Sequence, residues 1–104
     1  MPDPPDPVDF VSAVLDVVDS IPPGRVMAYG EIAALLGSRA SRAVGTVMAR
    51  YGSEAAWWRV VRSSGAPPLG HEERARLEYE REGTPLVVTP TGYRVDVRTA
   101  RWRP

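Results

Sequence analysis

The stretch "AYGEIAALLGSRASRAVGTVMARYG" (residues 28–52) decides the fold of this 104-residue chain, because it holds two short helical patterns in close succession. In the first, "GEIAALLG", the apolar residues Ile32, Leu35 and Leu36 recur at helical spacing and Gly37 is the expected C-cap. "SRAS" is a polar connection, and "RAVGTVMARYG" predicts a further helix. Two short helices joined by about four residues form a helix-turn-helix candidate.

The second of these helices, residues 41–51, has two different faces. A core face at i, i+3, i+4 and i+7 spacing holds Val44, Val47, Met48 and Tyr51. The opposite face holds small or polar residues at the same spacing, namely Arg42, Gly45, Thr46 and Ala49. A glycine inside a helix costs about 1 kcal/mol relative to alanine. A face of small residues lets the backbone approach another surface, and both a neighbouring helix and DNA fit this pattern.

Working outward, the chain reads as a single domain over residues 8–104, preceded by a disordered or extended Pro/Asp-rich lead at 1–7. Val11, Val14, Leu15 and Val18 predict an amphipathic helix that ends before the "IPPGR" turn. "RVMAY" is a short extended piece, "SSGAPPLG" a loop and "HEERARLEYEREG" a charged helix. "TPLVVTPTGYRVDV" predicts a hairpin around "TPTG". We therefore expect a mixed, mostly α, winged-helix-like helix-turn-helix domain with a small β-hairpin near the C-terminus.

The composition excludes several kinds of chemistry. The chain has no cysteine, so it has no disulfide, no thiolate metal site and no cysteine nucleophile. Its only histidine is His71, which excludes a multi-histidine metal centre. We expect no metal and no cofactor.

Charge is balanced overall but unevenly distributed. The chain has thirteen basic residues, all of them arginine, and thirteen acidic residues. Residues 39–62 hold five arginines against the single acid Glu54, and residues 94–103 hold four against Asp96. Such segregation can present a basic face suited to phosphate, although a set of solvated arginines explains the same counts. The start "MPDPPDPVDF" lacks the pattern of a secretion signal, and no apolar run could span a membrane, so we expect a cytoplasmic monomer without membrane association.

A second unusual stretch is "EAAWWRVVRSSG" (residues 54–65), which places two of the three tryptophans side by side. Neighbouring side chains point to different faces of a helix or a strand, so Trp57 and Trp58 cannot easily enter one core pocket. One of the two is therefore a candidate for a role outside the core.

Taken in order, "AYGEIAALLG", "RAVG", "WWRVVRSSG", "EREG" and "GYR" resemble the C-terminal domain of O6-alkylguanine-DNA alkyltransferase. The chain is most similar to the alkyltransferase-like proteins, in which tryptophan commonly replaces the reactive cysteine. The resemblance covers roughly residues 8 to 103. It implies that Trp57 stands at the cysteine position and Trp58 at the position of its activating histidine, that Arg42 is the finger that fills the space left by a flipped base, and that Tyr29 contacts the neighbouring phosphate.

The same resemblance makes 41–51 a recognition helix in the minor groove. It implies a lesion pocket of Trp57, Tyr29, Arg59, Val60 and Ser63, and DNA contacts from Ser41, Arg42, Ala43, Gly45, Thr46 and Tyr29. The minor groove is roughly 6 Å wide, which suits a helix face of small residues.

The chemistry of the site points to binding without reaction. Alkyl transfer needs a strong nucleophile such as a thiolate, whereas an indole ring can only pack against a base or an alkyl group. We expect a non-enzymatic sensor that binds O6-alkylguanine in double-stranded DNA, flips the base and flags it for nucleotide excision repair proteins. Flipping costs a few kcal/mol, which stacking of about 1–3 kcal/mol per base can offset.

Three departures from the family pattern accompany this hypothesis. Ala56 replaces a proline, and Trp58 replaces the histidine. The stretch from Arg42 to Trp57 is about two residues shorter than the family pattern, and the loop after "SSG" is also short and lacks a lesion-contacting arginine, which leaves Arg74 as a candidate. Two alternatives stay open. One is a sequence-specific winged-helix regulator, and the other is a glycosylase or nuclease that uses Glu82 or Asp96.

Overall fold

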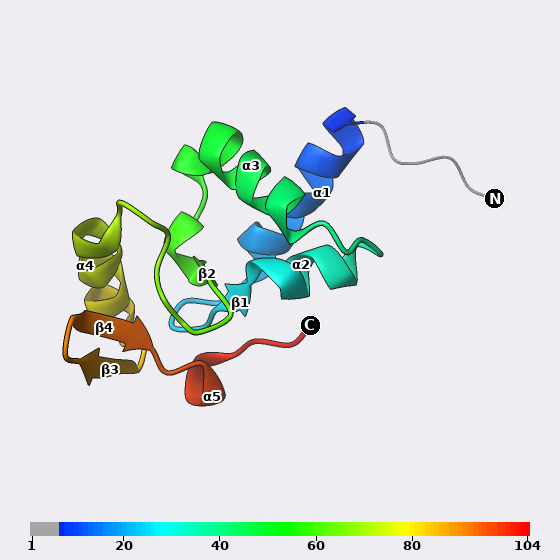
Figure 1. Ribbon diagram of the computed structural model, residues 1–104. Coiled ribbons are helices and arrows are strands. Elements are labelled where there is room, and N and C mark those ends of the chain that lie inside the picture. Colours follow the sequence, from blue (N-terminus) through cyan, green and yellow to red (C-terminus); the bar gives the residue numbers. More distant parts are fainter. Residues whose placement is uncertain (1–6) are drawn as a thin grey trace.

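The computed structural model describes residues 7–104 (Figure 1). The expected lead at residues 1–6 lies outside the described residues, whereas Pro7 is already the first residue of helix α1 (Pro7–Ser20). One face of α1 enters the core, where the side chains of Val14 and Val18 are fully buried. After the proline-glycine turn, the chain continues into the helical pair predicted from residues 28–52.

That pair consists of α2 (Tyr29–Leu35) and α3 (Ser41–Tyr51), which pack against each other and against α1. Gly37 adopts a φ of +73°, a left-handed conformation that favours glycine. Its N–H donates to the carbonyl of Ala34, and the N–H of Ser38 donates to that of Ala33. These two bonds end α2 and turn the chain toward α3.

The connection from α3 to the rest of the domain is made of two single 3₁₀ turns, η1 (Gly52–Glu54) and η2 (Trp57–Arg59). They lead into strand β2 (Val60–Val61), which pairs in parallel with β1 (Met27–Ala28), so that Met27 lies opposite Val60. The sequence indicates an extended piece near Met27 but not this pairing. The β1–β2 pair places the tryptophan turn beside the start of α2.

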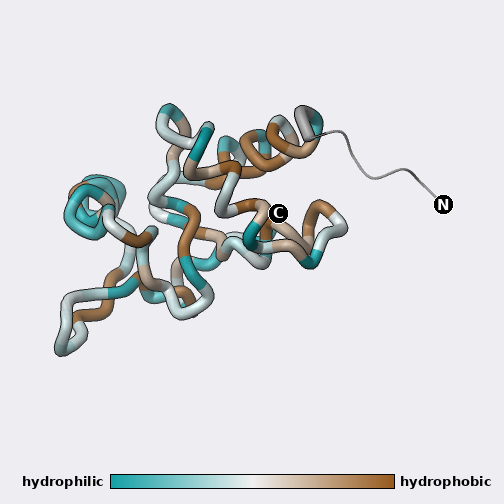
Figure 2. The backbone as a smooth tube through the Cα atoms, turned by 45° about the horizontal axis from the view of Figure 1, so that its top comes forward, coloured by the Kyte–Doolittle hydropathy of each residue, from teal (hydrophilic) through white to brown (hydrophobic). Residues whose placement is uncertain are grey.

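The C-terminal part contains α4 (Glu72–Glu82), the antiparallel strands β3 (Leu86–Thr89) and β4 (Gly92–Val95), and the short α5 (Val97–Ala100). Figure 2 shows that the residues of helix α4 are mainly hydrophilic. Its buried side chains are Ala75 and Tyr79, and the Tyr79 ring meets Tyr93 of β4 edge-on at a centroid distance of 6.2 Å. The prediction of a mostly helical domain with a small hairpin near the C-terminus is confirmed.

Two clusters of buried side chains hold these parts together. One joins α1, α2 and α3, and the other joins β2, α4 and β4, while Trp57 packs against both. The prediction that Tyr51 belongs to the core is wrong, because this residue is 53% exposed. It is the last residue of α3, and the core ends one turn earlier at Met48, whose side chain packs against Gly52.

Candidate nucleic-acid interface

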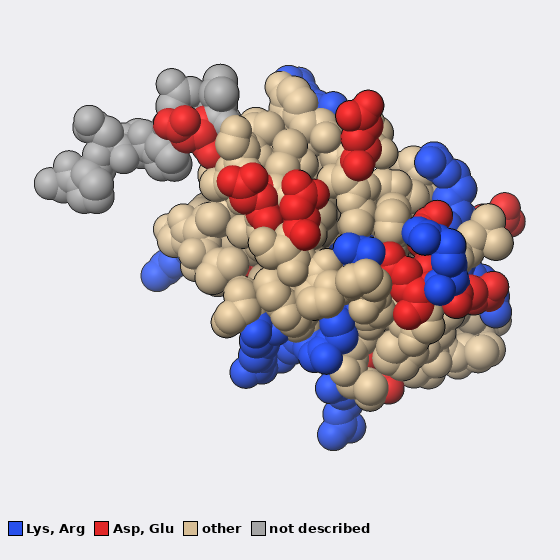
Figure 3. Space-filling view, turned by 180° about the vertical axis from the view of Figure 1, so that it is seen from behind, with Lys and Arg blue, Asp and Glu red and all other residues tan. Residues whose placement is uncertain are grey.

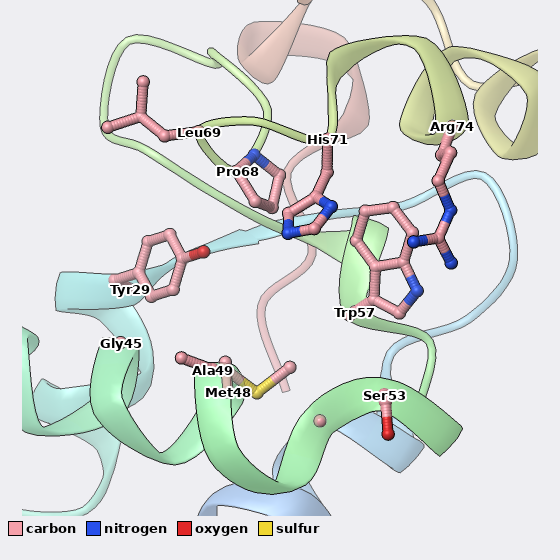
Figure 4. A pocket seen from close by; sticks show the side chains of 11 residues that line it. Tyr29, Gly45, Met48, Ala49, Ser53, Trp57, Pro68, Leu69, His71 and Arg74 are labelled. Atoms are coloured by element: carbon pink, nitrogen blue, oxygen red, sulfur yellow. The ribbon is translucent and has the colours of Figure 1, made fainter.

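A cavity of about 300 Å³ opens between α2, α3, the η2 turn and the start of α4 (Figure 4). Its walls are mostly apolar or aromatic, with a few groups that can form hydrogen bonds. It is lined by Tyr29, Gly45, Met48, Ala49, Gly52, Ser53, Trp57, Pro68, Leu69, His71 and Arg74. A concave apolar site with a few polar groups is the usual form of a pocket that holds a small molecule or a base.

Trp57 forms one end of this cavity. The indole is partly buried, and three side chains surround it. Trp58 meets it edge-on at a centroid distance of 5.6 Å, the His71 ring lies at 5.5 Å, and the Arg74 guanidinium carbon lies 5.5 Å from the ring centroid. Because η2 is a single tight turn, the two tryptophans leave it in different directions, and Trp57 is the one that reaches the cavity.

Tyr29 stands at the other end of the cavity, with its hydroxyl group directed inward (Figure 4). Burial raises the pKa of this hydroxyl, and the nearby Arg62 only partly opposes the effect. The group is therefore protonated at neutral pH and can donate a hydrogen bond. Glu31 fixes the start of α2, since its carboxylate accepts the N–H of Ala28 at 3.0 Å and pairs with Arg101 at 2.7 Å.

A second, shallower hollow adjoins the cavity. It is lined by Tyr29, Gly30, Ser41, Arg42, Gly45, Arg62, Ser63, Pro68 and Leu69. Tyr29, Gly45, Pro68 and Leu69 line both depressions, so the two form one continuous surface along α2 and α3. Five residues that the sequence proposed for DNA or lesion contact, Tyr29, Ser41, Arg42, Gly45 and Ser63, are thus brought together here.

Two glycines of this surface, Gly30 and Gly45, have no packing role inside the domain. A Cβ atom added to Gly45 of α3, or to Gly30 of α2, would meet no heavy atom of another part of the chain within 4 Å. Close packing against another helix, one of the two interpretations of the small-residue face, therefore does not explain Gly45. The glycine lowers the side-chain bulk of a surface that lies open.

The N-terminal turn of α3 is suited to an anion. It contains no acidic residue, and no side chain caps it. Arg42 is exposed and forms no ion pair with any residue from 7 to 104. The N–H groups of Ser41 and Ala43 already donate to the carbonyls of Arg39 and Ala40, so it is the helix dipole, together with the exposed Arg42, that favours negative charge at this end.

The far side of the η2 turn is built differently. Arg59 binds Glu82 through two nitrogens, with Nη2 at 2.5 Å from Oε1 and Nε at 3.1 Å from Oε2, and it donates to the carbonyl of Ile21 at 2.9 Å. The Gly24 N–H also donates to Glu82 at 3.0 Å. Burial raises the pKa of the Glu82 carboxyl, but the bonds from Arg59 and Gly24 outweigh it, so this pKa lies below its usual value.

Two residues of the predicted lesion pocket lie on that far side. Arg59 is held in the ion pair with Glu82, and Val60 is fully buried in β2, so neither lines the cavity. On α3, Ala43 is half-buried and Thr46 is exposed, with its hydroxyl donating to the Arg42 carbonyl at 3.1 Å, and neither lines the two hollows.

The acids of the enzyme alternative also have structural roles. The Glu82 side chain is only 4% exposed and is held by Arg59. Asp96 precedes α5, where its carboxylate accepts the Thr99 hydroxyl at 3.0 Å and its carbonyl accepts the N–H of Ala100 at 2.9 Å. Neither lines the cavity.

Sequence reasoning missed several residues of the cavity. Met48 was assigned to the core alone, His71 to a surface helix start, and Pro68 and Leu69 to an ordinary loop. No local pattern in the sequence identifies them, because the loop folds back over α2 and α3 only in the tertiary structure. Over residues 7–104 there is no cluster of three or more potential metal ligands. None of the helices in this range has the length and apolar character needed to cross a membrane.

Comparison with known proteins agrees with this architecture. Residues 9–84 match the family model of the 6-O-methylguanine DNA methyltransferase DNA-binding domain. A DNA base-flipping protein of Escherichia coli is 35% identical over 96 residues, which are 89% of this chain and 74% of that protein. Alkyltransferase-like protein 1 of Schizosaccharomyces pombe is 33% identical over 104 residues, covering 92% of this chain and 96% of that protein.

The structural comparison gives the same result. A crystal structure of S. pombe Atl1 in complex with damaged DNA containing O6-carboxymethylguanine matches with a TM-score of 0.82 and 32% identity, covering 93% of this chain and 97% of that one. A further S. pombe Atl1 structure in complex with DNA matches equally well, with a TM-score of 0.82 and 31% identity. The chain therefore belongs to the family of the 6-O-methylguanine DNA methyltransferase DNA-binding domain, as a homologue of its alkyltransferase-like and base-flipping members.

Proposed function

We propose that this protein binds double-stranded DNA through the surface of α2 and α3, flips an O6-alkylguanine into the Trp57 cavity and holds it there without removing the alkyl group. The observation that carries the proposal is the continuous surface from Arg42 and Gly45 to Trp57. The related Atl1 structure in complex with DNA containing a modified guanine supports DNA as the partner.

The division of roles follows from the positions of the side chains. The small face of α3 enters the minor groove, where Gly45 allows the backbone to come close to the sugars and phosphates. Arg42, exposed at the start of α3, fills the gap that the flipped base leaves in the stack. Tyr29, whose hydroxyl stays protonated, donates a hydrogen bond to the phosphate beside the flipped nucleotide.

In the cavity, the base stacks on the Trp57 indole. Stacking of about 1–3 kcal/mol per base offsets the few kcal/mol that flipping costs, and a lesion that weakens base pairing lowers this cost further. The chain has no cysteine, and the indole is not a useful nucleophile, so the alkyl group stays on the base. The bound protein then serves as a mark for other repair proteins, in the first place those of nucleotide excision repair.

Equilibrium binding of two duplexes that differ only at one O6-methylguanine tests the proposal. The wild-type protein should bind the methylated duplex about tenfold more tightly or better. The methyl group should still be on the DNA recovered after long incubation. Equal affinity for the two duplexes, or loss of the methyl group, would contradict the proposal.

The role of Arg42 is tested with a matched control on the same helix. Arg42→Ala should lose most of the preference for the methylated duplex, because the space left by the flipped base is no longer filled. Arg50→Ala removes another exposed arginine, in the last turn of α3, which lines neither hollow, and this variant should keep the preference. An equal loss in both variants would show that only the general charge of α3 matters.

A further inference from the structure

Resting on the function proposed above, we propose that Arg62 binds the same phosphate as Tyr29, so that the two side chains together hold the DNA backbone beside the flipped nucleotide. Strands β1 and β2 run parallel, with Ala28 opposite Val61. Tyr29 is the residue after β1 and Arg62 is the residue after β2, so both leave the strand pair at the same end. Both also line the shallower hollow that adjoins the Trp57 cavity. The topology thus brings a hydroxyl group and a guanidinium to one place on the proposed DNA surface.

The guanidinium of Arg62 is held by the loop that follows it. Its Nε and Nη2 atoms donate to the carbonyl of Pro67 at 3.2 and 3.0 Å, and its backbone N–H donates to the carbonyl of Ala66 at 2.9 Å. Its Nη1 atom has no hydrogen-bond partner among residues 7–104. Because the guanidinium is a rigid planar group, fixing one edge on Pro67 leaves the donors of the other edge at a defined position. Such a group loses little conformational freedom when it binds an anion.

No acid neutralises the charge of Arg62. It forms no ion pair with any residue from 7 to 104, and no acidic side chain lines the hollow. The Glu72 carboxylate at the start of α4 accepts the N–H of Gly70 at 3.1 Å instead. Figure 3, which views the molecule from behind, shows acidic side chains grouped toward the side where the described chain begins. The hollow is therefore a positive region that suits an anion.

The Tyr29 hydroxyl lies within the electrostatic influence of Arg62. Burial raises the pKa of this hydroxyl, and the positive charge of Arg62 acts against that effect. A phosphate placed at the hydroxyl is therefore attracted by the guanidinium as well. Charge-assisted hydrogen bonds from arginine to phosphate are roughly twice as strong as bonds between neutral groups, so Arg62 supplies the stronger of the two contacts.

The settings of Arg62 and Arg42 assign them different tasks. Arg42 is exposed at the start of α3, so its side chain can extend into the duplex. Arg62 is half-buried and bound to Pro67, which keeps it at the protein surface, where the DNA backbone passes. Arg62 is thus a binding residue for the backbone, and it holds the phosphate in place while the base turns into the cavity.

Duplexes with one uncharged backbone linkage test the inference. The phosphates around the O6-methylguanine are replaced one at a time by methylphosphonate, which removes the negative charge and leaves the base sequence unchanged. For the wild-type protein, one replacement next to the lesion should weaken binding about tenfold. Arg62→Gln should bind the duplex with all its phosphates about tenfold more weakly, and the same replacement should then cost less than about twofold, because the contact is already lost. In Tyr29→Phe, that replacement should also cost less than it does in the wild-type protein.

Arg94→Gln is the matched control, because it removes a half-buried arginine of β4 that lines neither hollow and has no ion pair within residues 7–104. It should keep the affinity and the sensitivity of the wild-type protein. Arg62→Lys, which keeps the charge but not the planar set of donors, should lie between the wild-type protein and Arg62→Gln. Thermal unfolding should show that each variant is folded at the temperature of the assay.

The outcomes separate the inference from the proposed function. A wild-type protein that is insensitive to every replacement, or an Arg62→Gln variant that keeps the full loss at the sensitive position, would overturn the role of Arg62 while leaving the proposed function in place. The role is also overturned if Arg62→Gln and Tyr29→Phe lose sensitivity at different phosphates. If the wild-type protein binds the O6-methylguanine duplex no more tightly than the unmodified duplex, the proposed function itself fails.

Discussion

The two tryptophans of the η2 turn separate the domain into regions of opposite character. Trp57 faces a cavity whose other walls include Tyr29, Met48, Leu69, His71 and Arg74. Trp58 faces inward, where the Tyr79 hydroxyl donates to its carbonyl at 2.6 Å and the Arg59 guanidinium lies 5.6 Å from its ring. The Trp57 side leaves a ring face and an arginine beside an open cavity, whereas the charged groups around Trp58 are bound to one another within the fold.

This difference shows how a binding site can be recognised without a ligand. On the Trp58 side, the Arg59–Glu82 ion pair links the η2 turn to the end of α4, and Arg59 also donates to the carbonyl of Ile21, although the buried Nε1 of Trp58 has no hydrogen-bond partner. On the Trp57 side, two glycines have no packing partner and two arginines, Arg42 and Arg74, have no ion pair within residues 7–104. Groups that the fold does not need are the best candidates for contacts with a partner molecule.

The largest effect on stability should come from replacing Arg59. Arg59→Met leaves the Glu82 carboxylate, only 4% exposed, without its partner, and breaking such a buried pair costs about 3 kcal/mol. The midpoint of thermal unfolding should fall by roughly 10–20 °C for a domain of this size. Below that midpoint, the ratio of affinities for methylated and unmodified DNA should be unchanged. A variant that keeps its stability but loses this ratio would place Arg59 in the lesion pocket after all.

Trp57→Ala, unlike Arg59→Met, should change the preference for the methylated duplex, in addition to any stability lost because Trp57 packs against both buried clusters. Removing the stacking surface should weaken binding of the O6-methylguanine duplex by about 30-fold, which corresponds to about 2 kcal/mol, within the range for stacking of one base. Binding of unmodified DNA should change much less, because it depends on α3 and the phosphates. Fluorescence anisotropy with both duplexes measures the two constants, and a uniform loss on both would assign Trp57 a structural role only.

Gly45→Ala should raise stability while the bulkier Gly45→Leu should impair binding. The added Cβ meets nothing within 4 Å, and alanine favours a helix interior over glycine by about 1 kcal/mol. Urea unfolding should therefore show a gain of up to about 1 kcal/mol for Gly45→Ala. Gly45→Leu should weaken the binding of both duplexes, since its side chain occupies the space that the minor groove requires. Tight DNA binding by Gly45→Leu would argue against close approach of α3.

The smallest expected effect is on the pH dependence of the free energy of unfolding. Because the pKa of Glu82 is lower in the folded protein than its usual value of 4.5, its contribution to stability is complete above that value and is lost as the pH falls through the folded pKa. Glu82→Gln removes this contribution. Its free energy of unfolding should be lower at neutral pH and should fall less steeply below pH 4.5, although Glu72, whose pKa is also lowered, still titrates in both proteins. Parallel curves for the two proteins would contradict this role of Glu82.

Much of the fold could be predicted from the sequence, because its elements are encoded locally. The helix periods, the Gly37 ending and the "TPTG" hairpin each depend on a few adjacent residues. The site was accessible only in part. Trp57, Tyr29, Arg42 and Gly45 could be named through the family resemblance, whereas the places of His71, Leu69 and Met48 depend on how the loop before α4 folds over α3. Arg59 adjoins the tryptophans in sequence, but the η2 turn directs it to Glu82 on the other side.

The most direct test of the difference between the two sides is the emission of tryptophan during DNA binding. A base stacked on an indole quenches its fluorescence, so saturating O6-methylguanine duplex should quench the wild-type protein more than saturating unmodified duplex does. In Trp57→Phe, which keeps an aromatic ring for the base, the methylated duplex should still bind and the additional quenching should disappear. Equal quenching by both duplexes in the wild-type protein, or additional quenching that survives in Trp57→Phe, would contradict the claim that Trp57 receives the flipped base.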